Sequence, residues 1–239
     1  MFGLYLYFYR MEIKHIFFDL DHTLWDFNKN SKETLAELYT ELNLSNYLPS
    51  FIEFYSKYLE VNDALWDLYR ENKISKDALR TVRFLNTFKY FNFFNSDVAE
   101  TLGSEYVARS PYKSNLFEGC HEVLIQLKLK YKLHIITNGF EEVQLIKLRS
   151  ANLTQYFSHI ITSEMAGVTK PHPQIFDYAL NAAKAKPEES IMIGDNFDVD
   201  CVGAENRGIK AVFFNPHSEK QNQSVSFEIR HLKELLTFL

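Results

Sequence analysis

The chain alternates short apolar runs with amphipathic helical patterns along most of its length. Five nearly continuous apolar runs predict strands that are buried on both faces: 13–20, 133–137, 159–162, 191–194 and 211–215. From about residue 117 onward these runs alternate with helical patterns at 118–129, 141–153 and 174–185. This alternation predicts an α/β domain with a mostly parallel sheet.

A long helical insert separates the first predicted strand from the second. Apolar positions at helical spacing predict helices near 35–42, 51–66, 79–88 and 98–107, the first capped by Asn30 or Ser31. The many aromatic residues of this insert share that spacing, which indicates helix packing rather than a base-stacking surface. The predicted architecture is a Rossmann-like core, residues 11–25 and 112–239, with an all-helical cap inserted at 26–111.

Composition and charge exclude several classes of protein. A chain of 239 residues can bury a sizeable core without disulfides or metals as staples. Its net charge of −5 provides no bulk attraction to nucleic acid or to an anionic membrane. The two cysteines, Cys120 and Cys201, lie outside any CxxC or Cys/His cluster, so we expect buried thiols.

The first ten residues, MFGLYLYFYR, form an apolar and aromatic run. The run is too short to span a bilayer and lacks the basic segment and cleavage site of a secretory signal. Met11 follows directly and opens MEIKHIFFDLD, which reads like a natural chain start. We therefore expect residues 1–10 to be a start-site artefact or a disordered extension of a soluble, cytoplasmic protein.

Two carboxylates follow the first predicted strand. Functional groups gather at the carboxyl ends of strands in an open α/β sheet. Alternation along an extended chain points the side chains of Asp19 and Asp21 to the same side. Their negative charges therefore repel unless a cation or a proton neutralises them. Capping of a helix or turn is the ordinary alternative for either residue.

Polar residues also follow the next three predicted strands. The second ends in Thr137-Asn138-Gly139, Lys170 follows the third, and an acidic segment from Asp195 to Asp200 lies at the end of the fourth. Taken singly, these are a common turn, a solvated loop charge and an acidic loop. Taken together, they predict a site in which Asp19 and Asp195 offer oxygen ligands to a hard cation such as Mg²⁺.

The order of these motifs resembles the haloacid dehalogenase-like (HAD) hydrolases. Asp-x-Asp-x-Thr, Thr-Asn-Gly, Lys-Pro and Gly-Asp-x₄-Asp occur in that sequence, and the resemblance covers Ile13 to Pro216. The insert is similar in position to the helical cap of the first type in that superfamily. The stretches TNGF…KL, YFSHIITSEMAGVTKPHPQIF and IMIGDNFDVD are most similar to its pyrimidine 5′-nucleotidase branch.

The resemblance implies a role for each matching residue. Asp19 would attack phosphorus to form an aspartyl-phosphate, and Asp21 would protonate the leaving group and then deprotonate water. That dual role implies a pKa of Asp21 raised toward neutrality. Thr137, with Asn138 and neighbouring amides, would hold the phosphoryl oxygens, while Lys170 would neutralise charge there.

The resemblance also implies a metal site. Mg²⁺ would be held by the Asp19 carboxylate, the backbone carbonyl of Asp21 and Asp195. Asp200 would support the ion from nearby, and Asn196 is a further candidate for that role.

The expected activity is Mg²⁺-dependent hydrolysis of nucleoside 5′-monophosphates, pyrimidine nucleotides foremost. Dehalogenation is disfavoured, because a halide leaves unprotonated and does not need the second acid, Asp21. Sugar phosphates are the alternative substrates. Two other classes stay open: a phospho-aspartate signalling domain of the receiver type, and a HAD fold that serves only as a binding module.

Candidate contacts to the leaving group lie after the first motif and in the insert. Trp25 and Phe27 would stack on a base, or else pack at a hinge. Arg83 or Arg80 would meet a polar edge or a second anion, or else be solvated helix charges. The expected partner is a small phosphorylated metabolite, with no nucleic-acid polymer and no membrane, and the sequence does not indicate an oligomeric state.

Overall fold

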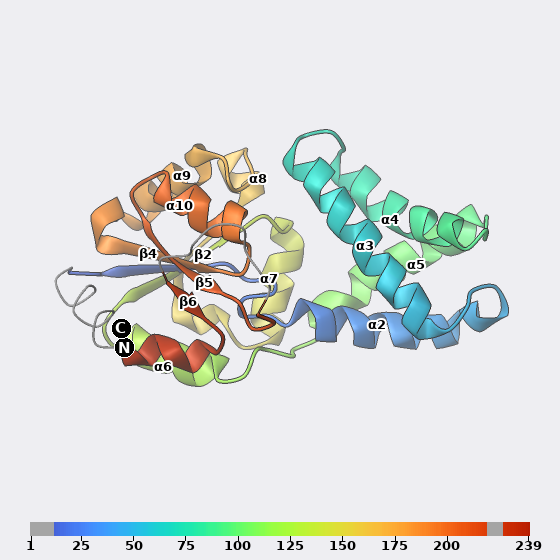
Figure 1. Ribbon diagram of the computed structural model, residues 1–239, viewed down its shortest axis with the longest axis horizontal. Helices are drawn as coiled ribbons and strands as arrows, with labels where there is room; N and C mark the ends of the chain where they lie inside the picture. The colour runs from blue at the N-terminus through green and yellow to red at the C-terminus, as the bar shows by residue number, and fades with distance from the viewer. Residues whose placement is uncertain (1–11, 219–226) are drawn as a thin grey trace. The chain divides into compact units, whose positions relative to one another are not determined.

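The computed structural model describes residues 12–218 and 227–239 (Figure 1). The predicted extension at residues 1–10 lies outside the described residues. Backbone contacts divide the chain into two compact units, one that runs up to Phe27 and resumes at Ser114, and one that spans Asn28–Lys113. Within the described ranges, no helix combines the length and the apolar character needed to cross a membrane.

The first unit is built on a parallel sheet, as predicted. In the described residues the sheet has six strands in the order β3-β2-β1-β4-β5-β6, and every neighbouring pair is parallel. The bounds are β1 His15–Phe18, β2 Lys132–Thr137, β3 Phe157–Thr162, β4 Ser190–Gly194, β5 Lys210–Phe214 and β6 Glu228–Ile229. The first five correspond to the predicted apolar runs, whereas β6 has only two residues and too little pattern to predict.

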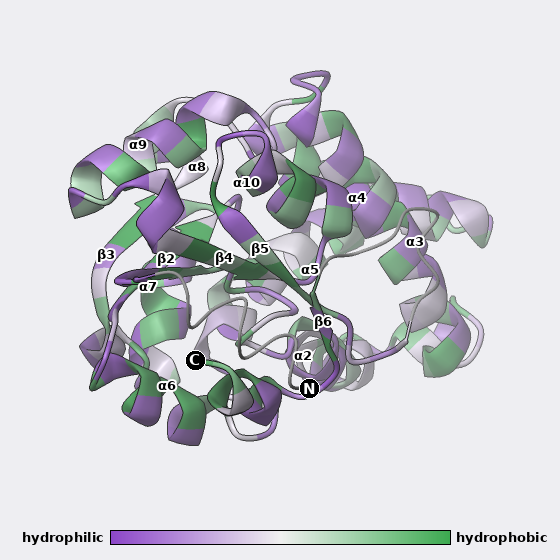
Figure 2. Ribbon diagram, turned by 60° about the vertical axis from the view of Figure 1, so that its left-hand side comes forward, coloured by the Kyte–Doolittle hydropathy of each residue, from purple (hydrophilic) through white to green (hydrophobic). Residues whose placement is uncertain are grey.

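Helices cover both faces of this sheet (Figure 1). Helices α6 (Cys120–Lys128) and α7 (Glu141–Ser150) pack against one face. The opposite face is covered by α8 (Ser163–Ala166), α9 (Pro173–Ala183) and α10 (Gly203–Glu205). The strands between them are strongly hydrophobic (Figure 2), which is the physical reason for their continuous apolar runs.

Strand register brings the predicted motifs to one edge of the sheet. On β1, Phe18 pairs with Ile135 of β2 and with Ile193 of β4. The residues just beyond these pairs, Asp19 and Thr137 among them, therefore emerge at the same edge. Both cysteines are free and buried, as predicted.

The second unit contains four long helices: α2 (Phe27–Glu41, which begins in the first unit), α3 (Phe51–Arg70), α4 (Lys76–Tyr90) and α5 (Ser96–Arg109). Their buried core is rich in aromatic rings, including Phe54, Tyr58, Phe84, Phe88 and Tyr106. This confirms that the aromatic residues at helical spacing serve helix packing.

The predicted N-cap of α2 is wrong. The helix already begins at Phe27, so Asn30 and Ser31 lie inside it and are buried. The Ser31 hydroxyl donates to the backbone oxygen of Asn28 at 3.2 Å and lies 2.9 Å from the hydroxyl of Tyr55. These contacts satisfy the hydroxyl within the helix, so it is not needed as a cap.

A row of histidines crosses three neighbouring strands. His134 on β2 is fully buried, and its ring stacks with those of His15 and His159 at centroid distances of 5.3 Å. Its Nε2 lies 3.1 Å from Nδ1 of His15. Burial, followed by repulsion from His15, His159 and Lys132, lowers the pKa of His134 to about 3.

This histidine is expected to make the fold acid-sensitive. His134 stays neutral in the folded protein and takes up a proton on unfolding, so its stability contribution is complete above pH ~6.5 and declines as the pH falls toward 3. As the pH falls through that window, the free energy of unfolding should decrease less steeply in a His134→Leu variant than in the wild type. The difference in slope should be up to about 1.4 kcal/mol per pH unit. Urea midpoints at pH 7.5 and 5.5 measure this. A His217→Gln control, at an exposed position away from these rings, should keep the wild-type slope, and equal slopes in all three proteins would refute the assignment.

Candidate active site

Asp19 occupies the first position after β1 and is only 7% exposed. Its backbone N–H donates to the carbonyl of Ile193 at 2.9 Å, which extends the ladder between β1 and β4 by one residue. This bond places Asp19 beside Asp195, which follows β4. The two carboxylates predicted to lie at neighbouring strand ends therefore do so.

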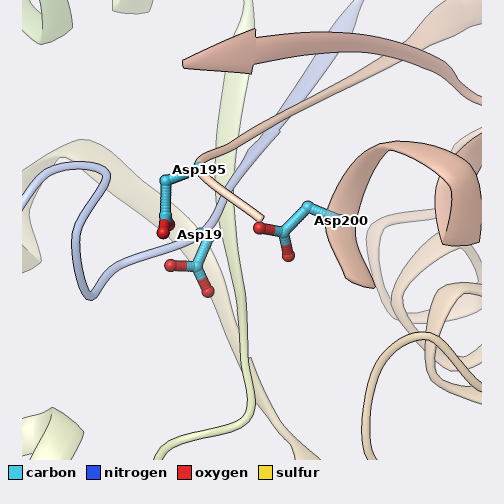
Figure 3. A group of neighbouring side chains, drawn as sticks. All are labelled: Asp19, Asp195 and Asp200. Atoms are coloured by element: carbon cyan, nitrogen blue, oxygen red, sulfur yellow. The ribbon is translucent and has the colours of Figure 1, made fainter. Parts of the chain in front are cut away.

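Asp19, Asp195 and Asp200 form an acidic cluster (Figure 3). One oxygen from each carboxylate lies within 4.8 Å of the other two. Asp200 enters from the π-helical turn Phe197–Val202 and accepts from the backbone N–H of Asn196 at 3.1 Å. Gly194 makes room for it, since a Cβ at that position would lie 2.3 Å from the Asp200 carboxylate.

The charges of this cluster are poorly compensated by the protein alone. Burial raises the pKa of Asp19 well above its usual range; Lys170 opposes the rise, whereas Asp200 and Asp195 add to it. Burial, together with Asp200, raises the pKa of Asp195 to about 8, although the Thr23 hydroxyl donates to it at 2.8 Å. Clustered carboxylate oxygens in this state fit a hard divalent cation, which would offset their repulsion.

Lys170 is a buried cation at the centre of the site, only 1% exposed, rather than a solvated loop charge. Its Nζ lies 2.6 Å from oxygens of both Asp19 and Asp200 and donates to the carbonyl of Ile136 at 2.8 Å. Burial lowers the pKa of Lys170, but Asp19 and Asp200 outweigh burial, and the net shift is upward. The ammonium therefore stays charged beside the predicted nucleophile.

Thr137 and Asn138 lie at the end of β2, and their side chains serve different purposes. The Thr137 oxygen accepts from the backbone N–H of Gly139 at 3.1 Å and from Gln144 at 3.2 Å. Its hydroxyl proton is thus left to donate. The Asn138 amide makes two hydrogen bonds to the backbone of Lys170. Its oxygen accepts from the Lys170 N–H at 2.7 Å, and its nitrogen donates to the Lys170 carbonyl at 3.0 Å. Its amide thus holds the loop that carries Lys170, and a contact of Asn138 with substrate stays a prediction.

Asp21 lies outside the acidic cluster and has its own cation. Lys147 Nζ donates to Oδ1 at 2.6 Å, and Gln144 Nε2 donates to Oδ2 at 2.7 Å. Burial raises the pKa of Asp21, but the charge and hydrogen bond of Lys147 and the bond from Gln144 outweigh it, so the net pKa is lowered. The expectation of a raised pKa is therefore wrong for this structure, because a lysine distant in sequence pairs with the carboxylate.

Gln144 and Lys147 were not singled out from the sequence. Both lie on α7 and are buried, at 0% and 6% exposure, on the face that also buries Leu148. Polar residues at positions that share a face with buried apolar residues are the signal that would have found them.

Trp25 was predicted to stack on a base or to pack at a hinge. Its indole is fully buried in the core of the first unit, and Lys147 Nζ lies 4.3 Å from a ring centroid. The packing alternative describes this ring, and the stacking prediction is wrong for this structure. Phe27 is half-buried, 4.7 Å from the ring of His22 and 6.3 Å from that of Trp25.

Arg83 is buried within the helical unit, at 6% exposure, rather than solvated. Its guanidinium lies 4.8 Å from the ring centroid of Tyr106 and 5.3 Å from that of Phe84. Arg80 is half-buried on the same helix. A role for Arg83 in substrate binding stays a prediction.

Comparison with known proteins identifies relatives across nearly the whole chain. Residues 16–214 match the family described as haloacid dehalogenase-like hydrolase. The chain is 30% identical over 233 residues to the pyrimidine 5′-nucleotidase PynA of Streptococcus pneumoniae, an alignment that covers 96% of each protein. It is 33% identical over 214 residues to a glyceraldehyde 3-phosphate phosphatase of Pyrococcus furiosus, covering 84% of this chain and 80% of that protein.

A solved structure shares the fold. The HAD-hydrolase YfnB from Bacillus subtilis, bound to magnesium, superposes with a TM-score of 0.86 at 26% identity. The superposition covers 95% of this chain and 98% of that one. Together with the family match and the relatives, it shows that this chain belongs to the haloacid dehalogenase-like hydrolase family and is a phosphatase of that family.

Proposed function

We propose that the protein is a Mg²⁺-dependent phosphatase that hydrolyses nucleoside 5′-monophosphates, pyrimidine nucleotides foremost, through an aspartyl-phosphate on Asp19. One observation carries the proposal: a buried carboxylate, Asp19, is held by Lys170 beside Asp195 and Asp200, with a second acid, Asp21, two residues away. This second acid favours a phosphate ester over a halide, because an alkoxide needs a proton to leave.

The proposed reaction has two steps. In the first, an oxygen of Asp19 bonds to phosphorus, the ester P–O bond breaks, and a proton from Asp21 goes to the leaving oxygen. In the second, the Asp21 carboxylate takes a proton from water. The water oxygen bonds to phosphorus, the bond between phosphorus and Asp19 breaks, and phosphate leaves. The Thr137 hydroxyl and the Lys170 ammonium counter charge on the phosphoryl oxygens.

Asp19, Asp195 and Asp200 would hold the Mg²⁺ ion, together with the backbone carbonyl of Asp21. When bound, the ion neutralises charge on the carboxylates and on the phosphoryl group. The buried, repelling cluster supports this assignment, as does the magnesium bound to YfnB.

The first step needs a protonated Asp21, whereas Lys147 and Gln144 favour its ionised form. An anionic phosphate ester bound next to Asp21 raises the pKa of that carboxyl by repulsion. Substrate binding thus favours the acid form in the step that uses it, and after the leaving group has departed Asp21 is the base.

The choice of substrate rests on the relatives. The pyrimidine 5′-nucleotidase PynA matches over more of this chain than does the glyceraldehyde 3-phosphate phosphatase. We propose that the helical unit selects the leaving group, as the resemblance implies. Sugar phosphates are the second candidate class, favoured by the identity of 33% to that phosphatase.

Phosphate release from a matched panel tests the proposal. Uridine and thymidine 5′-monophosphates are compared with ribose 5-phosphate and glyceraldehyde 3-phosphate, each with Mg²⁺ and with EDTA. We expect turnover that requires Mg²⁺, with kcat/KM for the pyrimidine nucleotides at least about 10-fold above that for the sugar phosphates, as one or two polar contacts supply.

Other results separate the alternatives. Equal or sugar-favouring kcat/KM would overturn the nucleotide assignment and retain the phosphatase. Stoichiometric, slowly decaying phosphorylation of the protein would indicate a phospho-aspartate switch. No release from any ester in Mg²⁺ would overturn the proposed function as a whole.

A further inference from the structure

Helix α7 presents two buried polar side chains to the predicted acid, Asp21. Lys147 and Gln144 each donate to a different oxygen of its carboxylate, at 2.6 and 2.7 Å. A carboxylate held at each oxygen by a different donor cannot rotate about its last bond without losing a charge-assisted hydrogen bond. The two donors thus determine the orientation of Asp21.

Gln144 also ties Asp21 to the residue predicted to hold the phosphoryl group. Its Nε2 lies 2.7 Å from Asp21 Oδ2 and 3.2 Å from Thr137 Oγ1, so one amide group reaches both. The opposite orientation of the amide would turn its carbonyl toward the carboxylate, which is repulsive. A single side chain therefore sets the separation between the acid and the Thr137 hydroxyl.

We propose that Gln144 and Lys147 are positioning residues that hold the Asp21 carboxyl in register with Thr137, so that it faces the leaving oxygen during phosphoryl transfer. This inference rests on the proposed function of Asp21 as acid and base. Catalytic groups need such support, because an error of about 1 Å in placement can lower a rate by about 100-fold.

Packing around the pair supports the assignment. A Cβ on residue 139 would lie 1.4 Å from the Nε2 of Gln144, so only glycine there leaves space for this amide. Lys147 Nζ lies 4.3 Å from a ring centroid of the buried Trp25, which places the ammonium over an aromatic face. The glycine after Thr137-Asn138 and the tryptophan after the first motif thus both serve the positioning of Asp21.

Gln144 and Lys147 contribute little to the stability of the fold. Gln144 is fully buried, and within the described residues its Oε1 has no hydrogen-bond partner, which lowers the stability of the fold. An ion pair as buried as that of Lys147 adds little over apolar residues of the same size. Local conflicts of this kind are typical of functional sites.

Leaving-group release in a single turnover tests the inference. This readout isolates the first step, in which the Asp19–phosphorus bond forms and Asp21 protonates the leaving oxygen. Uridine 5′-monophosphate and ribose 5-phosphate have alkoxide leaving groups, which need a proton from the acid. The p-nitrophenolate leaving group of p-nitrophenyl phosphate does not need one. We expect Lys147→Met and Gln144→Leu to slow release from the alkyl esters by about 10–100-fold and from p-nitrophenyl phosphate by about 3-fold or less.

Three further variants sharpen the test. In an Asp21→Asn background, Lys147→Met should have no additional effect on the alkyl esters, because residues that act as a unit are not additive. Lys147→Arg, which keeps the charge, should recover part of the lost rate. Arg149→Met removes an exposed cation from the same helix and should match the wild type.

The outcomes are distinguishable. Equal slowing of both classes of ester, or no slowing of either, overturns the positioning role while the phosphatase stands. Additive losses in the Asp21→Asn background overturn it too. A wild type that releases nothing from any ester contradicts the proposed function instead. Should Lys147→Met fail to fold, Gln144→Leu and Lys147→Arg carry the same comparison.

Discussion

An Asp19→Asn variant is expected to lose about 10⁴-fold or more of its phosphate release, because an amide cannot form the aspartyl-phosphate. The same change should leave the fold intact. Asp19 is buried among Asp195 and Asp200, and removal of its charge relieves repulsion in that cluster. In EDTA we therefore expect a thermal midpoint equal to or above that of the wild type.

The measurement pairs steady-state phosphate release with thermal unfolding in EDTA and in Mg²⁺. Asp198→Asn is the matched control, since Asp198 is an exposed acid of the turn Phe197–Val202, which also carries Asp200. It should retain activity. A variant at Asp19 that keeps more than about one tenth of wild-type kcat would contradict its role as nucleophile.

Lys170→Met is expected to lower both activity and stability. The change leaves Asp19 and Asp200 buried without the cation that lies 2.6 Å from each. Removal of one partner from a buried ion pair costs about 3–5 kcal/mol of the free energy of unfolding. Phosphate release should fall by at least about 100-fold, because the charge beside the nucleophile and the phosphoryl group is gone.

Urea unfolding in EDTA and in Mg²⁺ measures the stability effect. If the acidic cluster binds the ion, Mg²⁺ should stabilise Lys170→Met more than the wild type, since it then supplies the missing positive charge. Lys186→Met, at an exposed position, is the control and should unfold like the wild type. A Lys170→Met protein as stable as the wild type in EDTA would refute the buried ion pair.

Much of the catalytic edge could be predicted from strand ends alone. Asp19 and Asp195 each follow an apolar run and Thr137 ends one, and parallel strands bring such positions to one edge of the sheet. Lys170 was placed correctly in the order of motifs, but its burial was not predictable. A lysine in a loop is ordinarily solvated, and only the two carboxylates that surround it make its burial stable.

The pKa of Asp21 was predicted to shift in the wrong direction. The expected role required a raised pKa, whereas Lys147 and Gln144 lower it. These two donors are more than 120 residues away, at separations of 126 and 123. Trp25 was likewise assigned a possible base contact, and the core of the first unit covers it.

The sequence by itself determined the parallel sheet, the helical insert and the identity of the acids and the lysine at the strand ends. Those features depend on local periodicity and on which residue follows each strand, and both can be read along the chain. Only the tertiary structure decided which cation pairs with which carboxylate, and hence the direction of each pKa shift. Coulombic and desolvation effects depend on distances and burial in space, and these arise when α7, β1 and β4 pack together.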